Sequence, residues 1–244
     1  MKLKHPIFGP LIKEQEDIVY IVSDLHLNHD KEFLWKARSG FIDYNGNLIE
    51  FNSCKEYTEY IFNELKELAF RHKNNGKKAY LVSLGDNCFN DASAEMFTRF
   101  SALEFEKIYS LAGNHSSGIN TIFGNTTNFE FNNFVLIGSN IPFRVRKDRF
   151  IQLSHFPIMD WDHNTYGVLC GHCHGGTEVL QEDNDSFGKI FDCGVDNAFR
   201  LKGRCYFTLE ECLDIIRNKE SFNKVQIHAK RKIEESFVDD PDDK

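Results

Sequence analysis

The chain has 244 residues, of which 41% are hydrophobic and 27% charged, and its formal net charge is −8. This composition is typical of a soluble globular protein that forms one large domain. The acidic balance excludes a generic polyanion binder, because affinity for a phosphate backbone grows with the number of Lys and Arg contacts.

The first half of the chain predicts strands that alternate with helices, which is typical of an α/β fold. Apolar, β-branched runs that end in polar residues predict buried strands at 17–26, 77–87 and 106–115. Between them, helical spacing of apolar residues predicts helices at 55–75 and 92–104. Ser53 is a candidate N-cap of the longer helix and Gly76 follows its end.

The second half predicts successive strands with short links, at 128–140, 143–155, 166–172 and 188–194. A helix over 208–219 follows, with Thr208 and Glu211 in the pattern of a capping box. The segment 28–53 contains YNGN and is expected to form a loop or hairpin over one face.

The domain organisation is expected to be simple, because no internal repeat or shift in composition divides the chain. We expect one domain over 1–237 and an acidic, disordered tail over 238–244.

Polar residues follow the three clearest strands, and they are Asp24, His26, Asp86, Asn114 and His115. In an α/β sheet, ligands bind beyond the carboxyl ends of the strands, so these side chains are expected to converge on one crevice. Asp24 and His26 are separated by one residue, and side chains with that spacing leave a strand on the same side.

Later segments add three imidazoles, those of His155, His172 and His174. Mixed Asp, Asn and His ligands suit Mn, Fe, Ni or Zn. Without His115, the remaining seven side chains are too many for one tetrahedral ion but suit two ions that share a bridging ligand. Two ions about 3.5–4 Å apart can clamp a phosphoryl group and activate water.

The segment LCGHCHGG (169–176) also admits a dithiol redox pair or a C-x-x-C-H haem attachment site. Both alternatives are disfavoured, because the N-terminus has no signal-peptide pattern and no convincing helix follows Gly176. The odd count of seven cysteines argues against a disulfide framework, and no apolar run approaches the length of a membrane span. We therefore expect a cytoplasmic protein with reduced thiols, and a metal-binding role for this segment.

The blocks Asp24-x-His26, Gly85-Asp86, Gly113-Asn114-His115, His155 and Gly171-His172-x-His174 resemble, in this order, the motifs of the calcineurin-like metallophosphoesterases. The segments SDLHLNH (23–29), LSHFPIMDW (153–161) and DCGVDNAFRLKGRCYFTLEE (192–211) resemble the small bacterial and phage-type members. The resemblance implies a four-layer α/β/β/α sandwich, with two mixed sheets flanked by helices.

The same resemblance implies two divalent metal ions, with manganese expected first and iron, nickel or zinc as alternatives. Asp24, His26 and His174 would hold one ion, Asn114, His155 and His172 the other, and Asp86 would bridge them. A metal-bridging hydroxide would attack phosphorus. His115 would be the catalytic residue that protonates the leaving group or steadies the transition-state charge.

The implied activity is hydrolysis of a phosphate ester. On the family likeness we expect a phosphodiesterase that acts on nucleotides or single-stranded nucleic acid. Alternatives are a phosphomonoesterase and a catalytically silent binding module of the same fold. The eukaryotic-type Ser/Thr phosphatases are disfavoured, because their Arg after the Gly-Asp block and their acidic residue after the Asn-His pair are missing. No membrane and no obligate protein partner is expected.

Four residues are candidates for the surroundings of the crevice. His29 and Asp30 are expected in a solvated loop, with contact to substrate at the crevice rim as the alternative. Trp161 and His163 follow the SHFP segment and could form a wall of the pocket, with a core position as the alternative for Trp161. The basic segment 143–150 is expected to be an exposed hairpin rather than a nucleic-acid contact.

Overall fold

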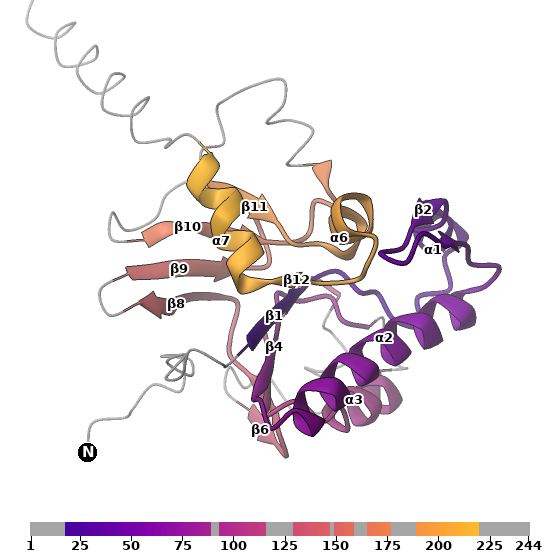
Figure 1. Ribbon diagram of the computed structural model, residues 1–244, viewed down its shortest axis with the longest axis horizontal. Coiled ribbons are helices and arrows are strands. Elements are labelled where there is room, and N and C mark those ends of the chain that lie inside the picture. Colours follow the sequence, from indigo (N-terminus) through magenta and orange to yellow (C-terminus); the bar gives the residue numbers. More distant parts are fainter. Residues whose placement is uncertain are drawn as a thin grey trace, which may run out of the picture.

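A computed structural model describes residues 18–88, 93–115, 129–146, 149–158, 165–176 and 189–219 (Figure 1). Within these ranges, helices accompany a six-stranded sheet, a four-stranded sheet and a small two-stranded hairpin. The predicted α/β class is therefore confirmed.

The six-stranded sheet has the order β12-β1-β4-β5-β7-β6. Its strands are β1 (Ile18–Val22), β4 (Ala79–Ser83), β5 (Lys107–Ser110), β6 (Phe129–Phe131), β7 (Phe134–Leu136) and β12 (Phe207–Thr208). The four central strands β1, β4, β5 and β7 run parallel, and the edge strands pair antiparallel. Parallel central strands place their carboxyl ends at one edge of the sheet.

The four-stranded sheet has the order β11-β10-β9-β8. Its strands are β8 (Asn140–Arg146), β9 (Arg149–Ser154), β10 (Thr165–Cys170) and β11 (Ile190–Asp192). Strands β9, β10 and β11 are parallel, and β8 pairs antiparallel with β9. This sheet therefore also has a shared carboxyl edge.

The helices are α1 (Glu32–Ala37), α2 (Cys54–Asn74), α3 (Ser93–Ser101), α6 (Val195–Lys202) and α7 (Leu209–Asn218). Helices α2 and α3 lie together on one side of the six-stranded sheet in Figure 1. Among the described residues, no helix is both long and apolar enough to span a membrane.

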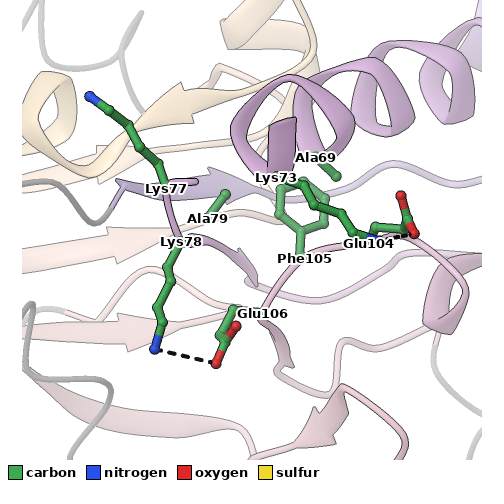
Figure 2. A pocket seen from close by; sticks show the side chains of 8 residues that line it. All are labelled: Ala69, Lys73, Lys77, Lys78, Ala79, Glu104, Phe105 and Glu106. Carbon is green, nitrogen blue, oxygen red and sulfur yellow. Dashed lines mark hydrogen bonds and ion pairs between the residues drawn. The ribbon is translucent and has the colours of Figure 1, made fainter. Parts of the chain in front are cut away.

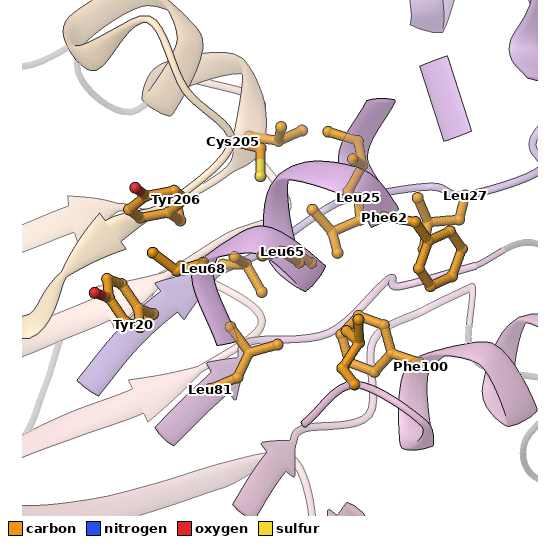
Figure 3. Packing of buried hydrophobic residues seen from close by; sticks show 14 of the residues in the cluster. Tyr20, Leu25, Leu27, Phe62, Leu65, Leu68, Leu81, Phe100, Cys205 and Tyr206 are labelled. Atoms are coloured by element: carbon orange, nitrogen blue, oxygen red, sulfur yellow. The ribbon is translucent and has the colours of Figure 1, made fainter. Parts of the chain in front are cut away.

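Alternate residues of the central strands fill two separate cores. Tyr20 and Val22 of β1 face α2 and α3, whereas Val19 and Ile21 face the four-stranded sheet. Figure 3 shows Leu65 and Leu68 of α2 in the first of these cores. Because both faces of the sheet are buried, the sequences of its parallel strands are continuously apolar and do not alternate between apolar and polar residues.

The local signals for α2 and α7 are confirmed. The Ser53 hydroxyl accepts a hydrogen bond from the Glu56 amide at 3.2 Å, and Gly76 follows the helix with a φ of +66°. Thr208 and Glu211 form the predicted capping box at the start of α7. Because these signals act over a few residues, the sequence alone reveals them.

The predicted hairpin within 28–53 is present as β2 (Phe41–Ile42) and β3 (Leu48–Ile49), and α1 precedes it. The single strand predicted over 128–140 is wrong. Strands β6 and β7 form a hairpin there, and it turns at Asn132 with a φ of +55°. Asn tolerates this left-handed conformation better than most residues, so the Asn132-Asn133 pair interrupts the apolar run.

The short helix α6 was not predicted. Its Gly194 N-cap makes no side-chain hydrogen bond, so the usual start signal is missing. Instead, the buried Asp192 carboxylate accepts a hydrogen bond from the Gly194 amide at 2.7 Å. The predicted acidic tail, Trp161 and His163 lie outside the described residues.

Contact between the two sheets is expected to contribute strongly to stability. Phe191 of β11 and Phe207 of β12 are fully buried, and their ring centroids lie 5.0 Å apart in an edge-to-face arrangement. Phe191→Ala should lower the free energy of unfolding by about 3–5 kcal/mol, because it leaves a cavity between the sheets.

Urea denaturation measures this change. Phe33→Ala is the control, because the Phe33 side chain is 69% exposed, and it should change the free energy by less than about 0.5 kcal/mol. Equal effects of the two substitutions would contradict the packing of the sheets described here.

Candidate metal centre

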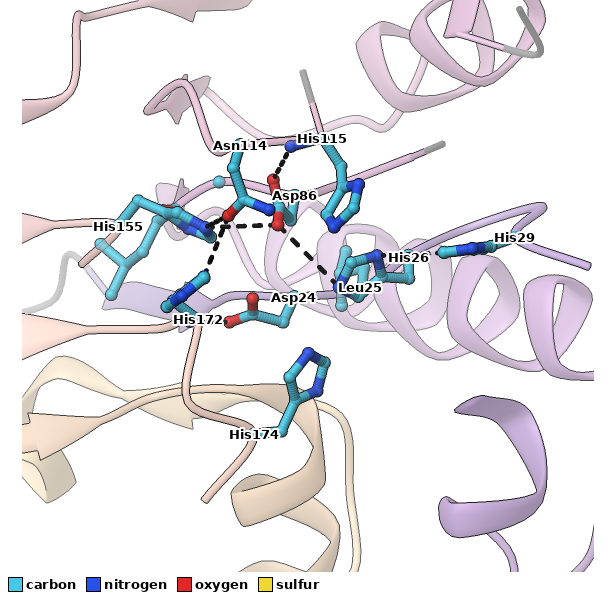
Figure 4. Close-up of polar contacts among 12 residues, drawn as sticks. Asp24, Leu25, His26, His29, Asp86, Asn114, His115, His155, His172 and His174 are labelled. Atoms are coloured by element: carbon cyan, nitrogen blue, oxygen red, sulfur yellow. Dashed lines mark hydrogen bonds and ion pairs between the residues drawn. The ribbon is translucent and has the colours of Figure 1, made fainter. Parts of the chain in front are cut away.

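The carboxyl edges of the two sheets meet, and the polar side chains that follow the strands lie there (Figure 4). From the six-stranded sheet, Asp24 and His26 follow β1, Asp86 follows β4, and Asn114 and His115 follow β5. From the four-stranded sheet, His155 follows β9, and His172 and His174 follow β10. The convergence predicted for these residues is therefore present in the fold.

One group consists of Asp24, His26 and His174. One potential ligand atom of each lies within 4.8 Å of the others, which is close enough for all three to hold one metal ion. Asp24 and His26 are buried, whereas His174 is exposed.

A second group consists of Asn114, His155 and His172. The Oδ1 atom of Asn114 lies 2.7 Å from Nε2 of His155 and 3.0 Å from Nδ1 of His172. These are the three residues that the family resemblance assigns to the second ion.

Asp86 lies between the two groups. Its Oδ2 atom is 3.2 Å from Nε2 of His155 and 4.0 Å from Nε2 of His26. Its Oδ1 atom accepts a hydrogen bond from the His115 amide at 2.8 Å. One carboxylate therefore faces both groups, as a bridging ligand must.

The His115 ring is close to the same centre. One potential ligand atom in each of His26, Asp86 and His115 lies within 4.8 Å of the others. The centroids of the His26 and His115 rings are 5.2 Å apart. The geometry therefore allows His115 either to contact a reacting group or to act as a ligand.

The backbone conformation that directs these side chains toward the centre differs from the extended one predicted. Asp24 and His26 have φ values of +56° and +46°, and His172 and His174 have values of +69° and +49°. Side-chain alternation along a strand therefore does not explain their common direction, because these residues are left-handed rather than extended. Such strained non-glycine residues cluster at functional sites.

Glycines allow the closest contacts in this centre. A Cβ atom on Gly171 would lie 2.2 Å from Oδ2 of Asp24, and one on Gly113 would lie 2.0 Å from Oδ1 of Asp86. These distances leave no room for a side chain at either glycine, so both carboxylates pack directly against the glycine backbone. The Gly-Asn-His and Gly-His-x-His patterns thus have a steric basis.

Two buried atoms of the first group suit a cation. Asp24 Oδ1 and His26 Nε2 have no hydrogen-bond partner within the described residues. Burial raises the pKa of Asp24, so additional positive charge nearby would stabilise its charged form. A divalent ion beside these atoms would supply it, so the residues present fit a metal ion.

Two of the imidazoles, those of His26 and His172, favour the neutral state that metal binding needs. Burial and the nearby Arg38 lower the pKa of His26 to about 3, and burial with the nearby His155 lowers the pKa of His172. Both rings are therefore neutral at pH 7, and a neutral ring offers a lone pair to a metal.

Asp86 and His155 behave as an ion pair. Burial opposes the charged form of each, but their mutual contact lowers the pKa of Asp86 and raises that of His155. The Nδ1 atom of His155 lies 3.0 Å from the Leu84 carbonyl, which accepts its hydrogen bond and directs Nε2 toward Asp86.

The centre has a buried floor and an open rim. Asp24, His26, Asp86 and His155 are each at most 3% exposed, whereas Asn114, His172 and His174 are exposed. A molecule from solvent can therefore reach the centre on the side of these last three residues.

Three residues near the centre were not assigned a site role. His29 was expected in a solvated loop, but it is buried, with its Nδ1 atom 3.4 Å from Nδ1 of His26. Arg38 and Asp196 lie behind His174, and burial alone would raise the pKa of Asp196. Contact with Arg38 and His174 instead holds that pKa well below its usual range. Arg38 lies outside every quoted motif, whereas His29 and Asp196 lie in the segments 23–29 and 192–211, whose family resemblance assigned neither of them a role.

Asn87 and Cys170 face away from the centre. The Asn87 amide donates a hydrogen bond to Ser110 Oγ at 2.8 Å and also contacts Ser83, so it links β4 to β5. The Cys170 thiol is buried against the Phe191 carbonyl, and Cys173 is half-buried.

A surface cavity of about 400 Å³ lies at the amino end of β4 (Figure 2), whereas Asp86 follows the carboxyl end of this strand. Its lining includes the ion pairs Lys73–Glu104 and Lys78–Glu106. Because these lysines are neutralised by glutamates, the cavity is a weaker candidate for a phosphate site than the His-rich centre.

Gly171→Ala tests the contact between the Gly-His-x-His loop and Asp24. The added methyl group would lie 2.0 Å from Ser23 Oγ and 2.2 Å from Asp24 Oδ2. It must displace these side chains or the loop itself, so affinity for Mn²⁺ should fall by about 10-fold or more. Equilibrium dialysis with elemental analysis measures it. Gly176→Ala is a control in the same loop, because a Cβ atom there meets nothing within 4 Å. Unchanged Mn²⁺ binding by a folded Gly171→Ala variant would show that metal binding does not depend on this contact between the loop and Asp24.

Comparison with known proteins gives little further information. No protein-family model and no curated protein matches the chain. Among solved structures, the protein of unknown function AQ665 from Aquifex aeolicus is similar over 82% of this chain and 99% of its own. The identity is 16% and the TM-score is 0.46, which is too low for an argument about fold or function.

Proposed function

We propose that the chain is a metal-dependent phosphoesterase with a centre for two divalent ions. The observation that carries the proposal is the position of Asp86 between two groups of metal-binding side chains, 3.2 Å from His155 and 4.0 Å from His26. Asp24, His26 and His174 would hold one ion, and Asn114, His155 and His172 the other.

The arrangement of layers supports the proposal. The family resemblance implies an α/β/β/α sandwich of four layers. Helices α2 and α3, the six-stranded sheet and the four-stranded sheet correspond to three of those layers in the expected order.

The donor set also supports it. Imidazole, carboxylate and amide oxygen together suit manganese, iron, nickel or zinc. Two such ions would neutralise phosphate oxygens and lower the pKa of a bound water, which is the chemistry that hydrolysis of a phosphate ester requires.

The residues of the chain have separate tasks in this reaction. Asp86 and Asp24 supply negative charge on the buried floor, so that positive charge can be held there. Asn114 and the two exposed imidazoles line the side from which a phosphate group approaches. His115 lies beside this centre and can donate a proton to the leaving-group oxygen.

The net charge of the protein restricts the class of substrate that it can bind. With a net charge of −8, the chain is poorly suited to a long duplex, whose binding depends on many Lys and Arg contacts. We propose a phosphodiester in a nucleotide or short single strand as the substrate class.

Asp86→Asn should reduce the amount of bound metal at both positions, because it removes the shared charge. Elemental analysis after dialysis against Mn²⁺ measures metal content, and hydrolysis of bis-p-nitrophenyl phosphate measures activity. Asp214→Asn changes an exposed carboxylate on α7 and should alter neither. Treatment with EDTA should abolish activity, and Mn²⁺ should restore it.

The same assay separates the alternatives. Faster hydrolysis of p-nitrophenyl phosphate than of the diester would favour a phosphomonoesterase. Bound metal with no hydrolysis of either compound would favour a binding module and contradict the proposed activity.

His115→Ala should lower turnover by about 100-fold to 10,000-fold, the range for loss of a positioned proton donor. Metal content should stay close to that of the wild type, because the other seven side chains remain. A loss of metal in this variant would identify His115 as a ligand and refute its role as proton donor.

A further inference from the structure

Arg38 is among the largest fully buried side chains of the described residues, and it lies directly behind the candidate metal centre. A buried guanidinium carries a positive charge and five N–H donors, all of which need partners. Nε donates to Asp196 Oδ1 at 3.1 Å, and one Nη donates to the Leu25 carbonyl at 3.0 Å and the Tyr57 hydroxyl at 2.5 Å. The other Nη donates to the Asp24 carbonyl at 2.7 Å and Asp196 Oδ2 at 3.1 Å.

Two of these contacts hold the backbone that carries Asp24 and His26. The carbonyls of Asp24 and Leu25 belong to the left-handed turn after β1, and Arg38 binds both of them. The Tyr57 hydroxyl also donates to the Leu25 carbonyl, at 2.6 Å. Arg38 therefore stabilises a strained turn at the point where two side chains of the first group leave the backbone.

The remaining contacts hold His174 through Asp196. Asp196 lies in the first turn of α6, and its Oδ2 atom is 2.7 Å from Nδ1 of His174. When Nδ1 donates its proton to this carboxylate, the lone pair of the ring lies on Nε2. Hydrogen bonds of this kind orient metal-binding histidines and raise their basicity.

The stability of the fold does not by itself account for this pair. The Arg38 side chain is 0% exposed and that of Asp196 is 17% exposed. A buried ion pair contributes little net stability, because the loss of hydration offsets the attraction. Positioning of functional groups is a separate reason to keep such a pair.

We propose that Arg38 and Asp196 are positioning residues for the ion held by Asp24, His26 and His174, and not for the ion held by Asn114, His155 and His172. This inference rests on the metal-binding part of the proposed function. Within the described residues, the contacts of the pair reach the backbone of the first group and the His174 ring. The two metal positions should therefore differ in their dependence on the pair.

Asp196→Ala tests the proposal with Co²⁺ alone as the probe, by calorimetric titration and by the visible absorption of bound Co²⁺. The wild type should bind two ions. The variant should bind one ion as the wild type does and the other about 10–100-fold more weakly. Glu59→Ala is the matched control, because it removes another carboxylate paired with an arginine, Arg99 at 2.8 Å, away from the centre.

A double-mutant cycle identifies the path of the effect. In a His174→Ala background, Asp196→Ala should cause little further loss of Co²⁺ affinity, because the ring that it orients is gone. In a His155→Ala background, the remaining ion is held by the first group. Asp196→Ala should then weaken the binding of this ion as much as it does in the wild-type background. If circular dichroism shows that Asp196→Ala does not fold, Asp196→Asn takes its place. This variant should also lose Co²⁺ affinity at one position only, by a smaller factor.

Equal weakening of both ions, or an undiminished loss in the His174→Ala background, would overturn the inference and indicate a general structural role. Two ions bound by Asp196→Ala as tightly as by the wild type would overturn it as well. All three results leave the proposed function intact. Failure of the wild type to bind Co²⁺ would instead refute the metal-binding basis of the proposed function.

Discussion

The direction of the strands is the constraint on which the candidate centre depends. Parallel strands of both sheets end at the same edge, and the sheets pack face to face through a shared core. Side chains that follow different strands are therefore forced together although they are far apart in the chain. Asp24 and His172 are an example, since the His172 amide donates to Asp24 Oδ2 at 2.8 Å.

Bringing acids and imidazoles together in a buried place is costly, because each charged group loses its hydration. The fold offsets part of this cost within the protein. Asp86 is paired with His155, and Arg38 is paired with Asp196. Asp24 receives an amide hydrogen bond but keeps one oxygen without a partner within the described residues, and burial raises its pKa. Buried groups with perturbed pKa values of this kind cluster at functional sites.

The same region departs from ideal backbone geometry. Asp24, His26, Asp86, His172 and His174 all have positive φ values. Each such residue costs about 1–3 kcal/mol, and persists only where the surrounding structure holds it. The helices α2 and α3 and the core between the sheets supply the rigid surroundings, and the glycines beside the carboxylates allow the close approach.

The sequence by itself determined the features that act over short distances: the alternation of strands and helices, the caps of α2 and α7, and the side chains that follow each strand. It could not determine which way those side chains face, because left-handed residues replaced the expected strand alternation. The positions of Arg38, Asp196 and His29 near the centre could not be predicted from the sequence for a related reason. Their burial and partners depend on packing between segments up to 158 positions apart, and only the tertiary structure decides that.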